Sequence, residues 1–363
     1  MGQIKSIADV DKNFEIVTKI NKDDVKFYDA SSGIFPLYGL VKGVPGEEFR
    51  RLPSAFSKTI SEHINFHGSN STGGRMRFIT NSKYVALHCE YRLANMGKSS
   101  TSTSTSTSGF DLYIVRDGKA VFYKQFSPPY DFTDGFESVV EFPNNEEKEI
   151  IIHFPLYNGV KKLYVGLQDS AYIKPSSYKH EKPIVFYGSS ITQGGCSSRP
   201  GLSYENYISR YFDTDFINLG FSGRAMGEPA IAEYIAGLDM SIFVMDYDHN
   251  APNAEHLEKT HEAFFRIIRK AQPNIPIIIM SKTDVPMTES AKREIKKRKS
   301  VIRKTYENAV ASGDSNVYFI DGQEIFAGSY GADCTVDACH PNDLGFAAMG
   351  ETIIKVIENN KLI

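Results

Sequence analysis

Short apolar runs follow one another through the first half of the chain, and turn-forming residues separate them. Between residues 25 and 173 the runs are rich in β-branched and aromatic residues, with Gly, Pro, Asn and Ser between them. Strands joined by turns, with no helical period between them, are typical of an antiparallel β-sandwich, and we expect a jelly-roll-like one here. The clearest runs are Tyr84–Tyr91, Phe110–Val115, Ala120–Phe126, Ile150–Phe154 and Leu163–Leu167.

One segment of this half contains no apolar residue. Ser99–Ser108 consists of Ser and Thr in near-perfect alternation. Because such a segment has nothing to bury in a core, we expect a mobile loop between two strands. Its period of two also suits an extended hairpin, which we rank second.

The second half shows a different alternation. Nearly all-apolar runs of four or five residues, typical of strands buried on both faces, are separated by stretches of helical length. This pattern predicts a parallel sheet with helices on both faces, in three α/β/α layers, and two domains at residues 1–178 and 179–363. The predicted strands are Ile184–Tyr187, Asp215–Leu219, Ile242–Met245, Ile277–Met280 and Val317–Ile320, and the predicted helices are Tyr204–Phe212, Glu228–Ala236, Glu255–Ala271 and Glu289–Ala311.

Composition narrows the classes of function. Of 363 residues, 41% are apolar and 23% charged, the balance of a globular protein. The net charge of −3 argues against binding to nucleic acid, and we expect the basic run Lys292–Lys304 to be the solvated face of a helix. The four cysteines form no disulfide framework. No apolar run reaches the roughly 20 residues of a membrane span, and Met1–Ile20 lacks a signal-peptide core, so we expect a cytoplasmic protein without membrane contact.

Candidate chemistry follows the predicted parallel strands. In an open parallel sheet, sites form at the carboxyl ends of the strands. Small residues, hydroxyls, an amide, carboxylates and imidazoles stand there, and these are the parts of an acyl-transfer site: a nucleophile, a base, an orienting carboxylate and oxyanion donors. The four segments concerned are Gly188–Gly195, Gly220–Gly223, Asp246–Pro252 and Asp337–Pro341.

Each part also has a structural explanation. The first segment lacks the Lys of a phosphate-binding loop and the spacing of a dinucleotide-binding turn, and its Ser residues are equally compatible with capping a helix. Asp337 could equally cap the helix that follows it, and His340 could be a histidine with a purely structural role. His249 is a rival candidate for the general base. Cys334, Cys339 and His340 suggest zinc, but their spacing matches no structural zinc pattern.

Taken in order, the four segments resemble the blocks of the SGNH, or GDSL-type, hydrolases over about residues 183–355. Gly188–Gly194 is similar to the first block, Gly-Asp-Ser-hydrophobic-Thr-x-Gly, and Asn218–Gly223 is similar to the second. Asn250 stands in the place of the third block's Asn, and Asp337-x-x-His340 resembles the last block.

The resemblance implies a fold, a reaction and a role for each residue. The fold would be the SGNH, flavodoxin-like α/β/α sheet, and the protein a serine esterase. Ser190 would attack the acyl carbonyl, His340 would take its proton and Asp337 would orient the imidazole. The N–H groups of Ser190 and Gly223 and the side-chain amide of Asn250 would form the oxyanion hole.

The sandwich half extends the resemblance, and two positions depart from the pattern. Gly109–Tyr113 resembles the Gly-x-Asp-Leu-Tyr motif of a sandwich domain that precedes one branch of these enzymes. Ser189 replaces the Asp of the first block, and Asn250 lies in Asp-His-Asn-Ala-Pro instead of Gly-x-Asn-Asp. Ser222, in Gly-Phe-Ser-Gly, is the rival nucleophile, but its context matches an oxyanion turn.

The substrate expected from these features is a short-chain ester. The loop Gly194–Ser203 is polar and Gly-rich, without the apolar side chains that line a pocket for long acyl chains. We therefore expect removal of small acyl groups, chiefly acetyl, from a small-molecule or carbohydrate ester, with no cofactor and no metal. An acyltransferase using the same residues and an inert carbohydrate-binding protein are the alternatives.

Overall fold

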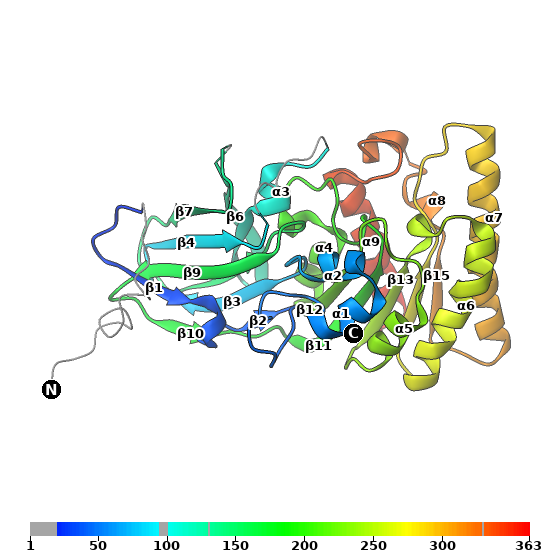
Figure 1. Cartoon of the computed structure of the whole chain (residues 1–363), viewed down its shortest axis with the longest axis horizontal. Coiled ribbons are helices and arrows are strands. Elements are labelled where there is room, and N and C mark those ends of the chain that lie inside the picture. The colour runs from blue at the N-terminus through cyan, green and yellow to red at the C-terminus, as the bar shows by residue number, and fades with distance from the viewer. Residues whose placement is uncertain (1–19, 94–100, 130, 329) are drawn as a thin grey trace.

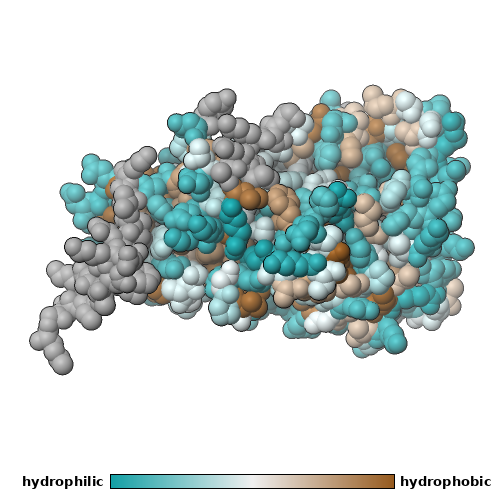
Figure 2. All heavy atoms as spheres, in the orientation of Figure 1, coloured by the Kyte–Doolittle hydropathy of each residue, from teal (hydrophilic) through white to brown (hydrophobic). Residues whose placement is uncertain are grey.

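The computed structural model describes residues 20–93, 101–129, 131–328 and 330–363. Antiparallel strands lie at one end of the molecule, and a parallel sheet covered by helices lies at the other (Figure 1). The region over the helices α6 (Ala254–Ala271) and α7 (Glu289–Ala311) is largely hydrophilic (Figure 2). The basic run Lys292–Lys304 is mostly exposed there, as expected. Arg298 is the exception, because it is buried and its guanidinium binds Asp248.

The N-terminal half contains two antiparallel sheets with one core between them. Alternate residues of β4 and β5, such as Val85, Leu87, Leu112 and Ile114, point into that core, which is the period of two that predicts strands. One sheet has the order β1-β9-β4-β7 and the other β10-β3-β8-β5-β6, with β2 on β3. Their bounds are β1 Val25–Asp29, β2 Leu37–Tyr38, β3 Arg75–Thr80, β4 Tyr84–Tyr91, β5 Phe110–Arg116, β6 Lys119–Phe126, β7 Gly135–Glu141, β8 Lys148–His153, β9 Val160–Gln168 and β10 Ile173–Pro175.

Helices also occur in this half, contrary to the sequence-based expectation. They are α1 (Ser54–Ile60), α2 (Glu62–Gly68) and α3 (Ser104–Ser108), each too short to display a helical period. The hydroxyl of Ser61 accepts from the N–H of Ile64 and so caps α2. Phe56 of α1 stacks on Tyr234, 4.8 Å between ring centroids, so these helices pack on the α/β half. The division into domains 1–178 and 179–363 therefore stays a prediction.

The Ser/Thr repeat is a second correction, since its described part is not a mobile loop. Residues 99 and 100 lie outside the described residues, but Ser104–Ser108 form α3 and Ser106–Ser108 are buried. Thr103 caps this helix by accepting from the N–H of Ser106, and its own hydroxyl donates to the Ser198 carbonyl at 2.6 Å. Hydroxyl groups thus take the place of apolar contacts, because they bond to backbone and side-chain partners: the Thr107 hydroxyl to the Thr103 carbonyl, and the Ser106 hydroxyl to the Ser197 hydroxyl.

The α/β half has five parallel strands in the order β12-β11-β13-β14-β15. Ile231 and Phe264 pack on one face of the sheet and Ile208 and Phe346 on the other, which makes three layers and confirms the predicted fold class. The strands are β11 His180–Gly188, β12 Thr214–Gly220, β13 Ile242–Asp246, β14 Ile277–Met280 and β15 Val317–Ile320. The helices are α4 Tyr204–Phe212, α5 Pro229–Ala236, α6 Ala254–Ala271, α7 Glu289–Ala311, α8 Gly322–Ile325 and α9 Asp343–Asn359, and the 3-10 turns are η3 Ala30–Ser32, η4 Pro200–Leu202, η5 Asp248–Asn250 and η6 Gly331–Cys334.

Buried charges join the two halves. Arg75 of β3 is fully buried, and its guanidinium pairs with the Asp215 carboxylate and donates to the Phe216 carbonyl at 3.0 Å. The same guanidinium lies 3.6 Å from the Phe216 ring centroid. A buried charge is tolerated only where it is paired, so these contacts hold β3 in one position against β12.

The Gly-x-Asp-Leu-Tyr segment forms a second junction. The Asp111 carboxylate, fully buried, accepts from Arg199 Nη1 and from the N–H of Gly201, both at 2.8 Å, and lies 2.7 Å from His153 Nδ1. Tyr113 receives a further hydrogen bond from Arg199 at 2.6 Å. Burial acts to raise the pKa of Asp111, but His153 and Arg199 outweigh it and lower that pKa. The motif thus holds the segment that follows the Ser190 loop.

Within the described residues, no helix combines the length and the apolar content that crossing a bilayer requires.

We expect Asp111→Ala to lower the free energy of unfolding by about 3 kcal/mol, because it leaves the half-buried Arg199 guanidinium and the buried His153 imidazole without their carboxylate. The change should appear as a lower midpoint in urea unfolding. Asp131→Ala, at an exposed position of the same half, is the matched control and should change stability by less than about 0.5 kcal/mol. Equal midpoints for the two variants would contradict the assigned role.

Candidate active site

The Ser190 turn follows directly from β11. Gly188 ends the strand, and a Cβ there would collide with the Thr192 hydroxyl and the Asp246 carbonyl. Ser190 has 9% of its surface exposed. Its carbonyl accepts from the N–H of Gly195 at 2.8 Å. The close approach of backbone and side chains permits only glycine at 188, and it holds Ser190 at the carboxyl edge of the sheet.

Ser190, His340 and Asp337 form one hydrogen-bonded chain. Ser190 Oγ lies 2.9 Å from His340 Nε2, and His340 Nδ1 lies 2.8 Å from Asp337 Oδ2. The N–H of His340 also donates to Asp337 Oδ1 at 2.7 Å. Partial burial acts to raise the pKa of Asp337, but these hydrogen bonds from His340 outweigh it and lower that pKa. A carboxylate, an imidazole and a hydroxyl in this order are the parts of a nucleophile activated by a base.

The loop that carries Asp337 and His340 precedes α9. Ala338 between them has φ +66°, a left-handed conformation that closes the turn and brings both side chains to one side. The cap of α9 is Asn342, whose side chain accepts from the N–H groups of Leu344 and Gly345. The interpretation of Asp337 as that helix cap is therefore wrong.

Two other candidate residues are engaged elsewhere. The N–H of Ser222 donates to Gln193 Oε1 at 3.0 Å, and its side chain interacts with the Tyr157 phenol. His249 faces Asp284, with Nε2 3.0 Å from Oδ1. Within the described residues neither makes the contact with a base or a nucleophile that its rival role requires.

Three hydrogen-bond donors without acceptors belong to the turns that follow β11 and its two neighbouring strands, β12 and β13. Gly223 adopts φ +68° in the turn after β12. Asn250 belongs to η5 after β13, and its Oδ1 accepts from the N–H of Ala225 at 3.2 Å. Because a backbone N–H only donates, this bond fixes the amide with Nδ2 on the other side. Throughout the described chain, neither the N–H groups of Ser190 and Gly223 nor Asn250 Nδ2 has a hydrogen-bond acceptor.

Gln193 is a residue that sequence reasoning missed. Its side chain is fully buried and connects the two halves of the molecule at the site. Oε1 accepts from the N–H of Ser222 at 3.0 Å, while Nε2 donates to Asn70 Oδ1 at 3.0 Å and to the Leu156 carbonyl at 3.1 Å. The sandwich half thus positions the turn that carries Gly223. Nothing in the local sequence signals this role, because both partners lie far away along the chain.

The layer beneath the Ser190 turn is also polar. Asp246, at the end of β13, is fully buried and accepts from the Thr192 hydroxyl at 3.2 Å and the Tyr204 phenol at 3.4 Å. Burial raises the pKa of Asp246 to about 6. These contacts support Thr192 of the turn and do not reach Ser190.

Two family models match the chain, one in each half. Residues 181–358 match the GDSL-like lipase/acylhydrolase family, and residues 25–173 match the N-terminus of SGNH-hydrolase-type esterases, named GxDLY. A search of curated proteins finds no match.

Solved structures resemble the chain over nearly its whole length. A protein from Bacteroides ovatus described as a GDSL-like lipase shares 29% identity and a TM-score of 0.84, over 92% of this chain and 97% of its own. A salicylyl-acyltransferase from a tetracycline biosynthetic pathway has 17% sequence identity and a TM-score of 0.76, and the match covers 94% of this chain and 99% of the acyltransferase. A family two carbohydrate esterase from Cellvibrio japonicus has 13% sequence identity and a TM-score of 0.59, and the match covers 93% of this chain and 98% of the esterase. The last two show the fold alone.

We expect Asn250→Ala to lower kcat on a chromogenic ester by about 100- to 1,000-fold with little change in KM, because an oxyanion donor acts mainly in the transition state. Asn274→Ala, at an exposed loop position, should keep parental kinetics. An unchanged kcat in Asn250→Ala would remove that amide from the site.

Proposed function

We propose that this protein removes short acyl groups, chiefly acetyl, from a polar alcohol. The chain belongs to the GDSL-like lipase/acylhydrolase family and carries the GxDLY N-terminus of SGNH-type esterases. It is therefore a carboxylic-ester hydrolase. The observation that carries the proposed mechanism is the continuous chain from Ser190 Oγ through His340 to Asp337, with contacts of 2.9 Å and 2.8 Å.

In the proposed reaction the acyl group passes through Ser190. Its Oγ attacks the acyl carbon while His340 Nε2 takes the hydroxyl proton. The same proton then passes to the departing alcohol, which leaves an acyl-enzyme. Water attacks this ester, gives its proton to His340, and the carboxylic acid leaves as the proton returns to Ser190. Asp337, whose pKa is lowered by its hydrogen bonds from His340, orients the imidazole and stabilises its charged form.

Charge that develops on the carbonyl oxygen needs donors that are already in place. The N–H groups of Ser190 and Gly223 and Nδ2 of Asn250 have no acceptor in the described chain and belong to three adjacent turns. Donors fixed before the reaction stabilise an oxyanion without reorganisation. This supports their assignment as the oxyanion hole.

The exposure of the triad supports a short acyl group. The side chains of His340 and Asp337 are 31% and 41% exposed, so they lie at an open surface. A pocket for a long acyl chain buries most of that chain against apolar side chains, whereas the loop Gly194–Ser203 after Ser190 is polar and Gly-rich. An open polar site favours a small acyl group on a polar alcohol.

A carbohydrate is the alcohol that the solved structures favour. Those of similar fold include the family two carbohydrate esterase described above and an acetyl xylan esterase from Butyrivibrio proteoclasticus, with 15% identity and a TM-score of 0.54, over 93% of this chain and 98% of its own. Similarity at this level is an analogy of fold, and the sugar is proposed on that basis together with the polar surroundings of Ser190.

Acyl transfer to an acceptor other than water is the second candidate. The salicylyl-acyltransferase matches this fold along almost the whole chain, and the same triad serves both reactions. Products measured with and without an added acceptor alcohol distinguish them, since a transferase forms a new ester where a hydrolase releases free acid.

We expect kcat/KM to fall from acetyl to butyryl to octanoyl esters of one leaving group, because the open site offers little apolar surface to a longer chain. Ser190→Ala, expected to lose about 10⁴-fold or more in kcat, gives the background rate. Acetate release from acetylated sugars, compared with alkyl acetates of similar reactivity, tests the alcohol. A preference for octanoyl esters would overturn the short-chain proposal.

A further inference from the structure

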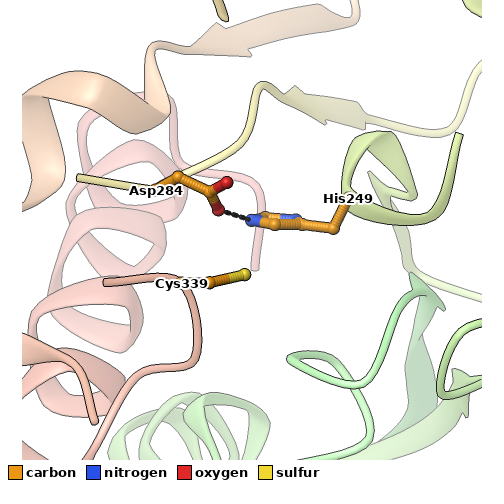
Figure 3. Close-up of side chains that lie close together, drawn as sticks. All are labelled: His249, Asp284 and Cys339. Atoms are coloured by element: carbon orange, nitrogen blue, oxygen red, sulfur yellow. Dashed lines mark ion pairs between the residues drawn. The ribbon is translucent and has the colours of Figure 1, made fainter. Parts of the chain in front are cut away.

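Three side chains of types that can bind metal ions, His249, Asp284 and Cys339, lie close together (Figure 3). The proposed reaction at Ser190 uses none of them. His249 lies in η5 after β13, Asp284 in the loop after β14, and Cys339 in the loop before α9. One ligand atom from each lies within 4.8 Å of the other two. The three residues come from segments far apart in the sequence, so only the fold brings them together.

His249 is buried without hydrogen-bond partners. Its side chain is 4% exposed, and neither ring nitrogen makes a hydrogen bond within the described residues. Nε2 and Asp284 Oδ1 form an ion pair at 3.0 Å, but neither atom makes a hydrogen bond, and Nδ1 has no partner within the described residues. A buried polar group without a partner costs about 1–3 kcal/mol, so the cluster has capacity for a ligand.

Backbone contacts hold the three loops together. The N–H of Val285 donates to the Ala338 carbonyl at 2.9 Å, next to Asp284 and Cys339 in the sequence. The N–H of Lys282 donates to Asp248 Oδ2 at 2.9 Å, next to His249. The cluster is therefore organised by contacts that do not involve its own donor atoms.

We propose that His249, Asp284 and Cys339 bind one Zn²⁺ ion. Imidazole, thiolate and carboxylate are the ligands that zinc takes in proteins, and three protein ligands leave a fourth position for water. The thiol disfavours Mg²⁺ and Ca²⁺, which prefer oxygen ligands.

The separations suit that ion. With zinc–nitrogen and zinc–oxygen bonds of about 2.0 Å and a zinc–sulfur bond of about 2.3 Å, tetrahedral ligands lie about 3.3–3.7 Å apart. The donors lie within 4.8 Å of one another, so contraction of about 1 Å suffices. Lys282 Nζ is 2.6 Å from Asp284 Oδ2, which leaves the other oxygen for the metal.

A proton competes with the metal at Cys339. Burial first, and then Asp284, raise the pKa of this thiol to about 12, so the metal-free protein keeps the thiol protonated and zinc binding releases that proton. The bound ion would link the η5 turn that carries Asn250 to the loop that carries His340. The proposal concerns binding at a separate cluster and holds whether or not Ser190 is the nucleophile.

Cobalt absorbance tests the site directly in the full chain. Titration of the metal-free protein with Co²⁺ should give one equivalent of bound metal with a thiolate-to-cobalt charge-transfer band, which Zn²⁺ displaces. Cys339→Ala should lose the band, while Cys334→Ala, at a buried cysteine outside the cluster, should keep it. His249→Ala should weaken binding by about 100-fold or more.

Proton release from the wild-type protein provides a test that needs no variant. Because zinc displaces the proton of the Cys339 thiol, binding of one Zn²⁺ in weakly buffered solution should release about one proton. Absence of the charge-transfer band, its persistence in Cys339→Ala, or zinc binding without proton release would each overturn the proposal.

Discussion

The position of β11 between β12 and β13 is the constraint on which the site depends. The chain leaves β11 for β12 on one side and later returns to β13 on the other, so this is the point where the strand order reverses. Parallel strands end at one edge, and a crevice opens where neighbouring connections diverge. Ser190 follows β11, Gly223 follows its neighbour β12, and Asn250 follows its other neighbour β13. The topology therefore places Ser190 between two turns that carry candidate donors, and the loop before α9 adds the His340 imidazole and the Asp337 carboxylate.

The sandwich half contributes to this site through buried polar contacts. The Gln193 amide accepts from the turn that carries Gly223 and donates to Asn70 and Leu156 of the sandwich half. The Asp111 carboxylate holds the segment after the Ser190 loop by a salt bridge with Arg199. Such contacts have strict geometry and are costly to leave unmade. They explain how the antiparallel half is held against the α/β half next to the Ser190 turn.

The sequence predicts the parts of this architecture that depend on local pattern. Strands buried on both faces are uninterrupted apolar runs, so all five parallel strands were predictable. The stretches of helical length between them predicted the main helices. The order of the four motif segments predicted the set of residues that includes Ser190 and His340. The fold class is confirmed, while the roles of these residues stay predictions. Helices α1–α3 were not predictable, because they are too short for a period and depend on tertiary partners. Gln193 and the cluster around His249 were missed for the same reason, since their partners are distant in sequence.

The central claim is that Ser190, activated by His340, is the nucleophile, and covalent labelling tests it most directly. A fluorophosphonate probe reacts with a serine only where a base and oxyanion donors assist it. After incubation with the intact protein, peptide mass spectrometry should find one label per chain on Ser190, absent from Ser190→Ala and retained in Ser222→Ala. A label on Ser222, or an active enzyme that takes no label on Ser190, would contradict the account.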